Sequence, residues 1–384
     1  MKLFVPVERS DGETRVALSP DTAKKLAALG FDVVVESGAG EMSRIPDRQF
    51  EAAGARIGKA ADGSDADVVL KVRRPTPKES KGYKSGALVI ASMDPYGHEK
   101  DVEAMASAGI SAFAMEFMPR ITRAQVMDVL SSQANLAGYQ AVVEAAATYD
   151  RALPMMMTAA GTVPAARVFV MGAGVAGLQA IATAKRLGAV VTATDVRPAA
   201  KEQVESLGAK FVAVEDEEFK QAETAGGYAK EMSKEYRDKQ AALVASHIAK
   251  QDIVITTALI PGRPAPRLVS KEMLESMAPG SVVVDLAVER GGNVEGAKPG
   301  EIAKVGGVSV VGYPNMAGRI AATASLLYAK NLLAFLETLV NKEAKALAVN
   351  LDDELVKATL LTHGGKVVHP AFAPKEPAPS QGAQ

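Results

Sequence analysis

The sequence of 384 residues contains no cysteine and no tryptophan, and only 5% of its residues are aromatic. The absence of cysteine excludes disulfide bonds, thiolate metal sites and cysteine nucleophiles. The histidines His98, His247, His363 and His369 are scattered without the spacing of metal ligands, and we therefore expect no metal site.

An excess of charge of either sign and long hydrophobic runs are also lacking. Lysine and arginine number 44 against 45 aspartate and glutamate residues, so the net charge is −1. The sequence therefore lacks the excess of positive charge that is typical of nucleic-acid-binding proteins. No apolar run reaches the roughly 18 residues that a membrane span needs. The first eight residues predict a strand and no signal peptide. The sequence thus predicts a cytoplasmic protein, and any coupling to a membrane would belong to other chains.

A glycine-rich stretch near the middle of the chain organises the rest. The apolar, β-branched run Val168–Met171 is typical of a buried strand, and Gly172, Gly174 and Gly177 follow at G-x-G-x-x-G spacing. Helical periodicity comes next, and a second strand then ends at Asp195. A strand, a glycine turn, a helix, a strand and an acid together predict a dinucleotide-binding site.

Each component of this motif has a physical role in such a site. The first glycine makes a tight turn, the second lets the backbone approach a pyrophosphate, and the third packs the helix on its strand. The helix N-terminus offers free N–H groups to the phosphates. Asp195 lies 18 residues after Gly177, a position suited to a ribose 2′-hydroxyl, and its charge favours NAD over NADP. Arg197 argues the other way, because a nearby arginine accepts a 2′-phosphate.

Strands and helices alternate along the whole chain, which predicts an α/β fold. We expect two Rossmann-like domains with parallel sheets, joined by long crossover helices. A partner domain would comprise residues 1–130 and 320–371, the dinucleotide domain would comprise residues 131–319, and residues 372–384 would form a disordered tail. The expected strands are Leu3–Val7, Asp32–Glu36, Asp67–Val72, Ala87–Ser92, Ser111–Phe117, Val168–Met171, Ala189–Thr194, Lys210–Val214, Asp252–Thr256, Ser281–Asp285 and Val308–Val311.

Two long helices are expected between these domains. Thr122–Thr148 predicts one helix, broken only mildly by Gly138, and Arg319–Val340 predicts the return crossover. The segments Ala346–Leu351 and Ala358–His369 would then add to the first domain.

The segment Glu215–Gln240 does not fit a compact α/β unit. It is acidic at its start and carries two glycines and Tyr228 in its middle. Insertions of this length are either functional lids or solvated charged segments. The functional interpretation is a mobile flap over the nucleotide, with Tyr228 at its tip.

A second polar group, Arg120, Gln125, Asp128 and Ser131, follows the expected strand that ends at Phe117. Ligands bind at the carboxyl ends of strands in parallel sheets, so this group is a candidate site. The structural alternative is a capping box, in which Gln125 reaches back to the N–H of Thr122 and Asp128 favours the helix N-terminus.

Nearly the whole chain resembles the soluble NAD(H)-binding alpha-1 subunits of proton-translocating nicotinamide nucleotide transhydrogenases. The stretches that carry the resemblance are Pro6–Arg9, Arg15–Pro20, Met118–Gln133, Met155–Pro164, Lys185–Val190, Lys201–Gly208, Glu223–Lys230, Thr257–Gly262 and Val368–Pro370. Matches of this length are more specific than the glycine motif alone.

The resemblance implies an enzyme that passes hydride between NAD(H) and NADP(H), with Re/Si specificity. It places Arg120, Gln125 and Asp128 beside the nicotinamide ring as the catalytic group, and it identifies the flap around Tyr228 as the family's mobile loop. It also implies a homodimer that pairs with a separate NADP(H)-binding component and a membrane proton channel on the cytoplasmic face of the inner membrane. The cofactor-binding residues so implied are Arg120, Gln125, Asp128, Ser131, Gly172, Gly174, Val175, Ala176, Gly177, Asp195, Val196, Arg197, Tyr228, Thr257, Ala258 and Leu259.

Two alternatives stay open. Alanine dehydrogenases are similar in architecture and have an arginine at the position of Arg15 and a lysine at that of Lys71. Their histidine corresponds here to Ser92, with His98 six residues further on, so the acid/base set is incomplete. Arg15 and Lys71 are then better interpreted as snorkelling or salt-bridged surface cations. A module that senses NADH without turnover is the other alternative.

Overall fold

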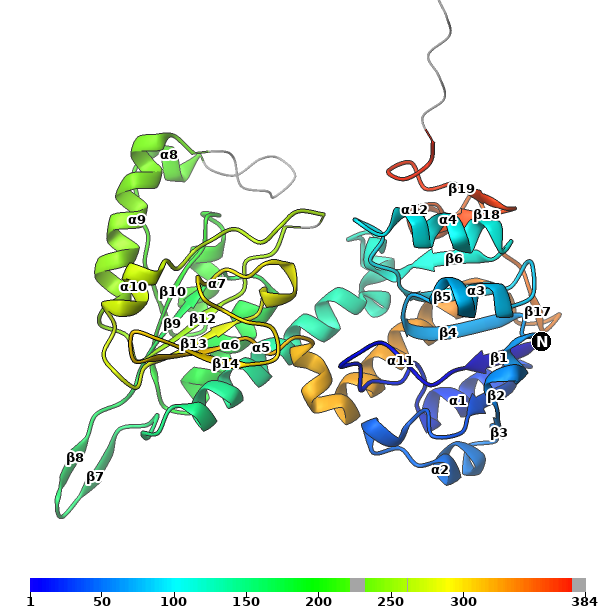
Figure 1. The fold of residues 1–384 in the computed structure, drawn as a ribbon, viewed down its shortest axis with the longest axis horizontal. Coiled ribbons are helices and arrows are strands. Elements are labelled where there is room, and N and C mark those ends of the chain that lie inside the picture. Colours follow the sequence, from blue (N-terminus) through cyan, green and yellow to red (C-terminus); the bar gives the residue numbers. More distant parts are fainter. Residues whose placement is uncertain (222–231, 261, 375–384) are drawn as a thin grey trace, which may run out of the picture. The chain divides into compact units, whose positions relative to one another are not determined.

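The computed structural model describes residues 1–221, 232–260 and 262–374. The chain divides into two compact units, Met1–Gln133 with Ile320–Gln384, and Ala134–Arg319, and each unit is built on its own sheet. Figure 1 shows the elements of both. The α/β class with parallel-dominated sheets, predicted from the alternation of strands and helices, is confirmed.

The sheet of the first unit runs in the order β19-β18-β6-β5-β4-β1-β2-β3 among the described residues. The strands β1 to β6 are parallel, and β18 and β19 complete the edge in antiparallel fashion. The bounds are β1 Lys2–Val5, β2 Asp32–Glu36, β3 Arg56–Gly58, β4 Val68–Arg73, β5 Leu88–Ser92, β6 Ser111–Ala114, β18 Leu360–His363 and β19 Lys366–Val367.

Both faces of this sheet are buried, as its apolar strands require. Leu3 of β1 shares one core cluster with residues of α1 (Pro20–Ala28) and α11 (Ala321–Thr338). Phe4 points the other way and shares a second cluster with residues of α4 (Glu99–Ser107). The other helices of the unit are α2 Asp47–Ala52, α3 Pro77–Gly82 and α12 Glu354–Thr359, with 3₁₀ turns η1 Glu41–Ser43, η2 Ala60–Gly63 and η3 Met115–Phe117.

Three expectations for this unit need correction. The strand expected over Ser111–Phe117 ends at Ala114, where η3 begins. The segment Ala346–Leu351 does not join the large sheet, because its strand β17 (Ala346–Leu347) pairs with β16 (Val340–Asn341) in a separate ribbon. Phe372 does not begin a disordered tail. Its ring packs on the rings of Tyr96 and Phe117, with centroids 4.9 and 6.0 Å away, and residues 375–384 lie outside the described residues.

The second unit holds a sheet in the order β11-β10-β9-β12-β13-β15-β14 among the described residues, parallel except for β14. The bounds are β9 Arg167–Met171, β10 Val190–Thr194, β11 Lys210–Phe211, β12 Ile253–Thr256, β13 Val282–Asp285, β14 Ile302–Val305 and β15 Val308–Val311. Alternate residues of β9 again face opposite ways. Val168 shares a core with Ile181 of α6 (Val175–Arg186), and Phe169 shares another with Ile248 of α9 (Lys234–Ile248).

The remaining helices of the unit are α7 Ala200–Ser206, α8 Glu217–Lys220 and α10 Lys271–Glu275, with the 3₁₀ turn η5 Val288–Arg290. A hairpin of β7 (Met156–Thr158) and β8 (Gly161–Val163) extends from the unit (Figure 1).

The helix expected over Thr122–Thr148 is two elements. A 3₁₀ helix, η4 (Thr122–Met127), is followed by α5 (Val129–Thr148), and Asp128 between them has extended backbone with φ −74° and ψ 92°. Gly138 does not break α5. A Cβ at this residue would lie 2.0 Å from the carbonyl oxygen of Ala176, so the glycine permits close packing of α5 on the start of α6.

One helix lies within, and a second begins within, the described parts of the segment 215–240 that was expected as an insertion. Helix α8 occupies Glu217–Lys220, and α9 begins at Lys234, where the Ser233 hydroxyl accepts from the Tyr236 N–H at 3.1 Å. Residues 222–231, including Tyr228, lie outside the described residues.

One described segment, Met316–Thr338, is long and apolar enough to cross a membrane by length and composition, which differs from the expectation that no such run exists. It comprises η6 (Met316–Ile320) and α11, and 56% of the 18-residue window that passes this test is buried inside the protein. A core helix passes the same test, and α11 contributes many residues to the core of the first unit.

Candidate functional site

The glycine turn lies between β9 and α6, and two of its three glycines are required by the protein itself. Gly172 has φ +105°, and a Cβ there would lie 2.4 Å from the Thr257 hydroxyl oxygen. A Cβ on Gly177 would lie 1.8 Å from the Gly172 carbonyl oxygen. The first glycine therefore makes the turn and the third lets α6 pack closely on it, as the motif predicts.

Gly174 is different, because no described part of the fold demands a glycine there. It caps α6 with φ −75° and ψ −169°, a conformation open to any residue, and among the described residues no atom lies within 4 Å of an added Cβ. The space in front of Gly174 borders the first turn of α6, where backbone N–H groups have no partners within the helix. This arrangement suits a ligand with negative charge that approaches the backbone closely.

Asp195 follows β10 and lies beside this turn. Its carboxylate accepts from the N–H of Ala173 at 2.7 Å, so the acid fixes the glycine loop. It also accepts from the Arg197 N–H at 2.9 Å and pairs with the Arg197 guanidinium through Nε at 2.9 Å and Nη2 at 3.1 Å. The side chain of Asp195 is 7% exposed and that of Arg197 is 33% exposed. The two residues that argued for NAD and for NADP thus form one ion pair.

The loop after β12 supplies the other side of the turn. The Thr257 hydroxyl donates to the Gly172 carbonyl at 3.1 Å. Ala258 is held by Asn293, whose amide donates to the Ala258 carbonyl at 2.9 Å and accepts from its N–H at 3.1 Å. Leu259 is 53% exposed. Asn293 is fully buried and was missed in the sequence, since a single asparagine in a loop carries no pattern.

The second unit thus brings Gly172, Gly174, Gly177, Asp195 and Thr257 together. Other residues predicted to bind the cofactor are next to these in the sequence, at the start of α6 and after Asp195, and their exposure is consistent with contact to a ligand. Val175 is 41% exposed and Val196 is 62% exposed, while Ala176 is half-buried in the first turn of α6.

The polar group predicted from Arg120 to Ser131 belongs to the first unit. Arg120 precedes η4, Gln125 lies on η4, and both are exposed. Asp128 caps α5, because its carboxylate accepts from the N–H of Ser131 at 2.9 Å and from the Ser131 hydroxyl. The alternative capping box at Thr122 is not formed, since η4 starts after Ile121 without a side-chain cap. Capping falls to Asp128, which leaves the exposed amide of Gln125 available to a ligand.

Comparison with known proteins decides the family. The family model "Alanine dehydrogenase/PNT, N-terminal domain" matches residues 4–137, and "Alanine dehydrogenase/PNT, C-terminal domain" matches residues 141–370. The chain belongs to this alanine dehydrogenase/PNT family. The resemblance to transhydrogenases is confirmed, and the family implies an oxidoreductase that binds NAD(H).

Relatives within the family are transhydrogenases and alanine dehydrogenases. The chain is 56% identical over 379 residues to an NAD(P) transhydrogenase subunit alpha protein of Rhodospirillum rubrum, and the match covers 97% of this chain and 99% of that protein. A transhydrogenase structure from Sinorhizobium meliloti matches with a TM-score of 0.88 and 70% identity, covering 96% and 100% of the two chains. The alanine dehydrogenase of Halomonas elongata is 31% identical, covering 97% of this chain and 96% of that one.

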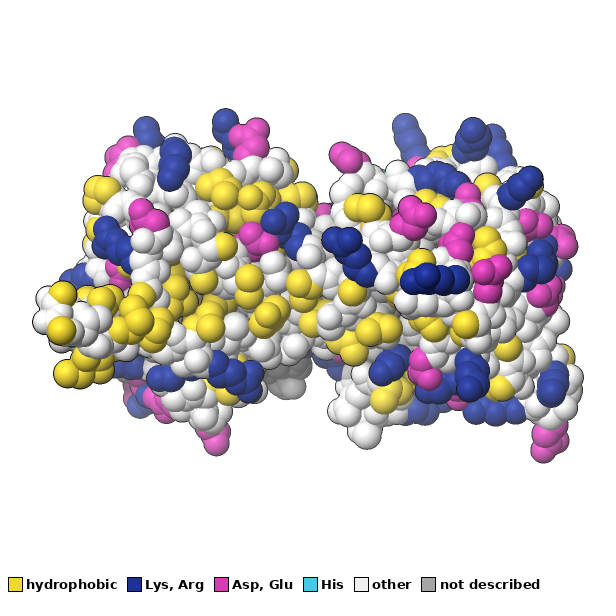
Figure 2. Space-filling view, turned by 90° about the horizontal axis from the view of Figure 1, so that it is seen from below, with side chains coloured by type: hydrophobic (Ala, Val, Ile, Leu, Met, Phe, Trp, Pro, Cys, Tyr) yellow, Lys and Arg dark blue, Asp and Glu magenta, His cyan; other side chains and the backbone are white. Residues whose placement is uncertain are grey.

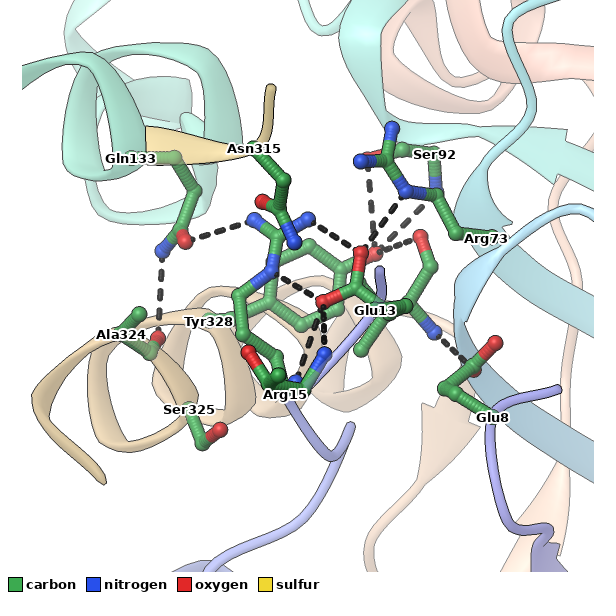
Figure 3. A network of polar contacts seen from close by, with 12 residues as sticks. Glu8, Glu13, Arg15, Arg73, Ser92, Gln133, Asn315, Ala324, Ser325 and Tyr328 are labelled. Atoms are coloured by element: carbon green, nitrogen blue, oxygen red, sulfur yellow. Dashed lines mark hydrogen bonds and ion pairs between the residues drawn. The ribbon is translucent and has the colours of Figure 1, made fainter. Parts of the chain in front are cut away.

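Arg15 and Lys71 are buried and paired within the first unit, and Figure 3 shows the contacts of Arg15. Arg15 is 8% exposed and contacts the Glu13 carboxylate through Nε and Nη2, both at 2.7 Å. Lys71 is 1% exposed and lies 3.0 Å from the Glu79 carboxylate and 3.4 Å from that of Glu8. The expected surface cations are therefore salt-bridged, but inside the protein.

The pKa values of the buried carboxylates Glu13 and Glu8, which pair with these two cations, shift in opposite directions. Burial works to raise the pKa of Glu13, but hydrogen bonds and charge from Arg15, with the charge of Arg73, outweigh it and lower the pKa to about 2. Burial raises the pKa of Glu8, and the nearby charge of Lys71 opposes that shift only in part. Glu13 is thus a firmly ionised partner for Arg15.

Proposed function

We propose that the chain is the NAD(H)-binding component of a proton-translocating transhydrogenase, which exchanges hydride with NADP(H) held on a separate subunit. The observation that carries the proposal is Gly174. Its missing side chain serves no purpose within the described protein, whereas a bound pyrophosphate needs that space.

The residues present fit NAD(H). The first turn of α6 would receive the pyrophosphate, and Asp195 would accept from the adenosine ribose hydroxyls once Arg197 yields part of its contact. When bound, NADH supplies the hydride from its nicotinamide ring. Arg120, Gln125 and Asp128 are proposed to contact the nicotinamide end, and the Glu215–Gln240 region with Tyr228 is proposed to close over the nucleotide.

Hydride transfer between two nicotinamide rings requires no proton donor on the protein. It requires the two rings close together with water excluded, so this chain contributes mainly positioning. An exposed amide such as Gln125 and an exposed guanidinium such as Arg120 suit this role, because they can hydrogen-bond the carboxamide of a nicotinamide and so hold its ring without acid/base chemistry. The Re/Si specificity would follow from which ring face they leave open.

The assembly also belongs to the proposal. Three consecutive methionines at the start of the hairpin β7–β8 are exposed: Met155, which precedes β7, and Met156 and Met157 on it, at 57%, 42% and 79%. Hydrophobic side chains gather at this end of the second unit (Figure 2). A groove of about 480 Å³ beside it is lined by Leu153, Leu187 and their neighbours. An isolated hairpin is marginal in water, and a self-complementary arm and groove suit a symmetric homodimer.

Proton translocation is assigned to membrane subunits, and this chain would lie on the cytoplasmic face of the inner membrane through its partners. The test is to mix the purified protein with an NADP(H)-binding component and follow NADH-dependent reduction of an NADP⁺ analogue. We expect rapid reduction that requires both proteins. No reduction with a partner shown to be competent would refute the proposal.

An alanine dehydrogenase activity is the other family function, and the same preparation tests it. Both candidate substrate cations already hold internal carboxylates, so we expect no oxidation of L-alanine with NAD⁺ by the protein alone.

A further inference from the structure

Arg15 has a second contact that leads away from the buried ion pair. Its Nη1 donates to the side-chain oxygen of Gln133 at 2.8 Å (Figure 3). The amide nitrogen of Gln133 in turn donates to the Ala324 carbonyl at 3.1 Å and approaches the Ser132 hydroxyl at 3.3 Å. The charge of Arg15 is thus connected by hydrogen bonds to the first turns of α5 and α11.

Asn331 of α11 continues this chain of contacts. It is 7% exposed, and its side-chain oxygen accepts from the Ser132 hydroxyl at 2.7 Å. Its amide nitrogen donates to the backbone carbonyl of Val126 at 2.8 Å. Val126 directly follows Gln125 and lies two residues before Asp128, so the chain of contacts ends on the backbone of the proposed nicotinamide segment.

We propose that the hydrogen-bond relay Arg15–Gln133–Ser132–Asn331–Val126 fixes the conformation of the Gln125–Asp128 segment, and that it sets the rate of hydride transfer in this way. Arg15 and Asn331 are then positioning residues. The effect on the rate of hydride transfer rests on the proposed function, whereas the fixed conformation of the Gln125–Asp128 segment does not.

The physical case begins with the segment itself. A 3₁₀ turn such as η4 has poor hydrogen-bond geometry and ends here at Asp128, whose backbone is extended, so it is weakly specified by its own bonds. A buried amide with both donor and acceptor engaged has one orientation, because turning it over would leave two groups unpaired. The amide of Asn331 therefore holds the backbone carbonyl of Val126 in one orientation.

The other end of the relay is equally fixed. Glu13 contacts two arms of the Arg15 guanidinium and leaves Nη1 to face Gln133. A bidentate pair of this kind is rigid, and connected hydrogen bonds in a buried network reinforce one another. Arg15, whose guanidinium is held by both Glu13 and Gln133, is suited to anchor the relay.

The central test is Asn331→Asp, with Asn341→Asp as the matched control. The first change removes the donor to Val126 and sets a carboxylate against its carbonyl. The second adds the same charge at an exposed residue, where the side-chain oxygen accepts from the N–H groups of Glu343 and Ala344 and an aspartate still does so. Gln133→Met, which breaks the relay without adding charge, serves if Asn331→Asp fails to fold.

Three quantities are measured for each variant: hydrogen exchange of the amides over residues 120–132, the Kd for NADH, and kcat with the NADP(H)-binding component. We expect faster exchange in that segment, an unchanged Kd, and a kcat lower by roughly tenfold or more, as a displaced contact group implies. The control should match the wild type in all three.

The outcomes separate the two proposals. Unchanged exchange over residues 120–132 in a folded variant overturns the relay, whether or not the wild type is active. Faster exchange with wild-type kcat overturns the positioning role and leaves a structural one. A wild-type protein that shows no turnover with a competent partner refutes the proposed function, and the exchange data then decide the relay alone. In a double-mutant cycle, Arg15→Lys should add little to the effect of Asn331→Asp on kcat, because both break one relay.

Discussion

Replacing Gly174 by alanine distinguishes a glycine kept for a ligand from one kept for the fold. The added methyl group meets no described atom within 4 Å, and φ −75° with ψ −169° suits alanine. Lower entropy of the unfolded chain favours the variant by about 0.4–1 kcal/mol, and the loss of glycine as an N-cap costs a similar amount. We therefore expect the free energy of unfolding to change by less than about 1 kcal/mol.

The affinity for NADH should respond very differently. The methyl group would occupy the space in front of the first turn of α6 and hold a pyrophosphate away from the N–H groups there. Loss of one charge-assisted hydrogen bond costs about 1.5–3 kcal/mol, so the Kd for NADH should rise about ten- to a hundredfold. Titration followed by NADH fluorescence measures this change, and urea unfolding measures stability.

Gly177→Ala is the matched comparison, because its Cβ would lie 1.8 Å from the Gly172 carbonyl oxygen. That variant should lose at least about 1–3 kcal/mol of stability through overpacking. The reasoning is refuted if Gly174→Ala binds NADH as the wild type does, or if it is destabilised as much as Gly177→Ala.

Side chains within each of the two units support four more predictions. Asp195→Ala should weaken NADH by roughly 1–3 kcal/mol and, by releasing Arg197, should strengthen NADPH; calorimetric titration of both nucleotides checks this. Gln125→Asn should slow hydride transfer with little change in the Kd for NADH, whereas a stability loss at constant rate would show a structural role. Glu13→Gln should lower the free energy of unfolding by on the order of 3 kcal/mol at pH 7. Because the pKa of Glu13 in the folded protein is lowered to about 2, this contribution is present above pH 4.5 and disappears as the pH falls toward 2. The free energies of unfolding of variant and wild type, measured with urea, should therefore converge near pH 2. Met157→Glu should convert the proposed dimer to a monomer in sedimentation equilibrium, while its NADH affinity stays close to that of the wild type.

The elements of the fold that local sequence specifies were predictable. Val168–Met171 is apolar at every position, and a strand buried on both faces needs this pattern whatever its neighbours are. The glycines that follow are constrained within a few residues of one another, as the 1.8 Å approach of a Gly177 Cβ to Gly172 shows. The position of Asp195 beside the turn follows from the pairing of β9 with β10, which the spacing of the two strands implies.

The features that were missed depend on contacts over long sequence separations. The periodicity of Thr122–Thr148 is helical throughout, and nothing local shows that the Val126 carbonyl is held by an asparagine 205 residues later. That bond, and the cap that Asp128 forms, accompany the change from η4 to α5. Phe372 follows the same rule, because its partners Tyr96 and Phe117 come from distant segments of the chain.

The buried ion pair of Arg15 and Glu13 bears on which of two reactions the chain suits, oxidation of an amino acid or hydride transfer between nicotinamides. A substrate carboxylate that competed with Glu13 for Arg15 would leave Glu13, which is buried and ionised, without its partner, and an unpaired buried charge costs several kcal/mol. An amino-acid dehydrogenase needs such a cation together with an acid/base group, and the resemblance to alanine dehydrogenases implies a serine, Ser92, at the position of their histidine. Hydride transfer between two nicotinamides needs neither group. A chain with that task is free to use Arg15 as the fixed end of a hydrogen-bond relay, and the contacts of Gln133 and Asn331 are what that use requires.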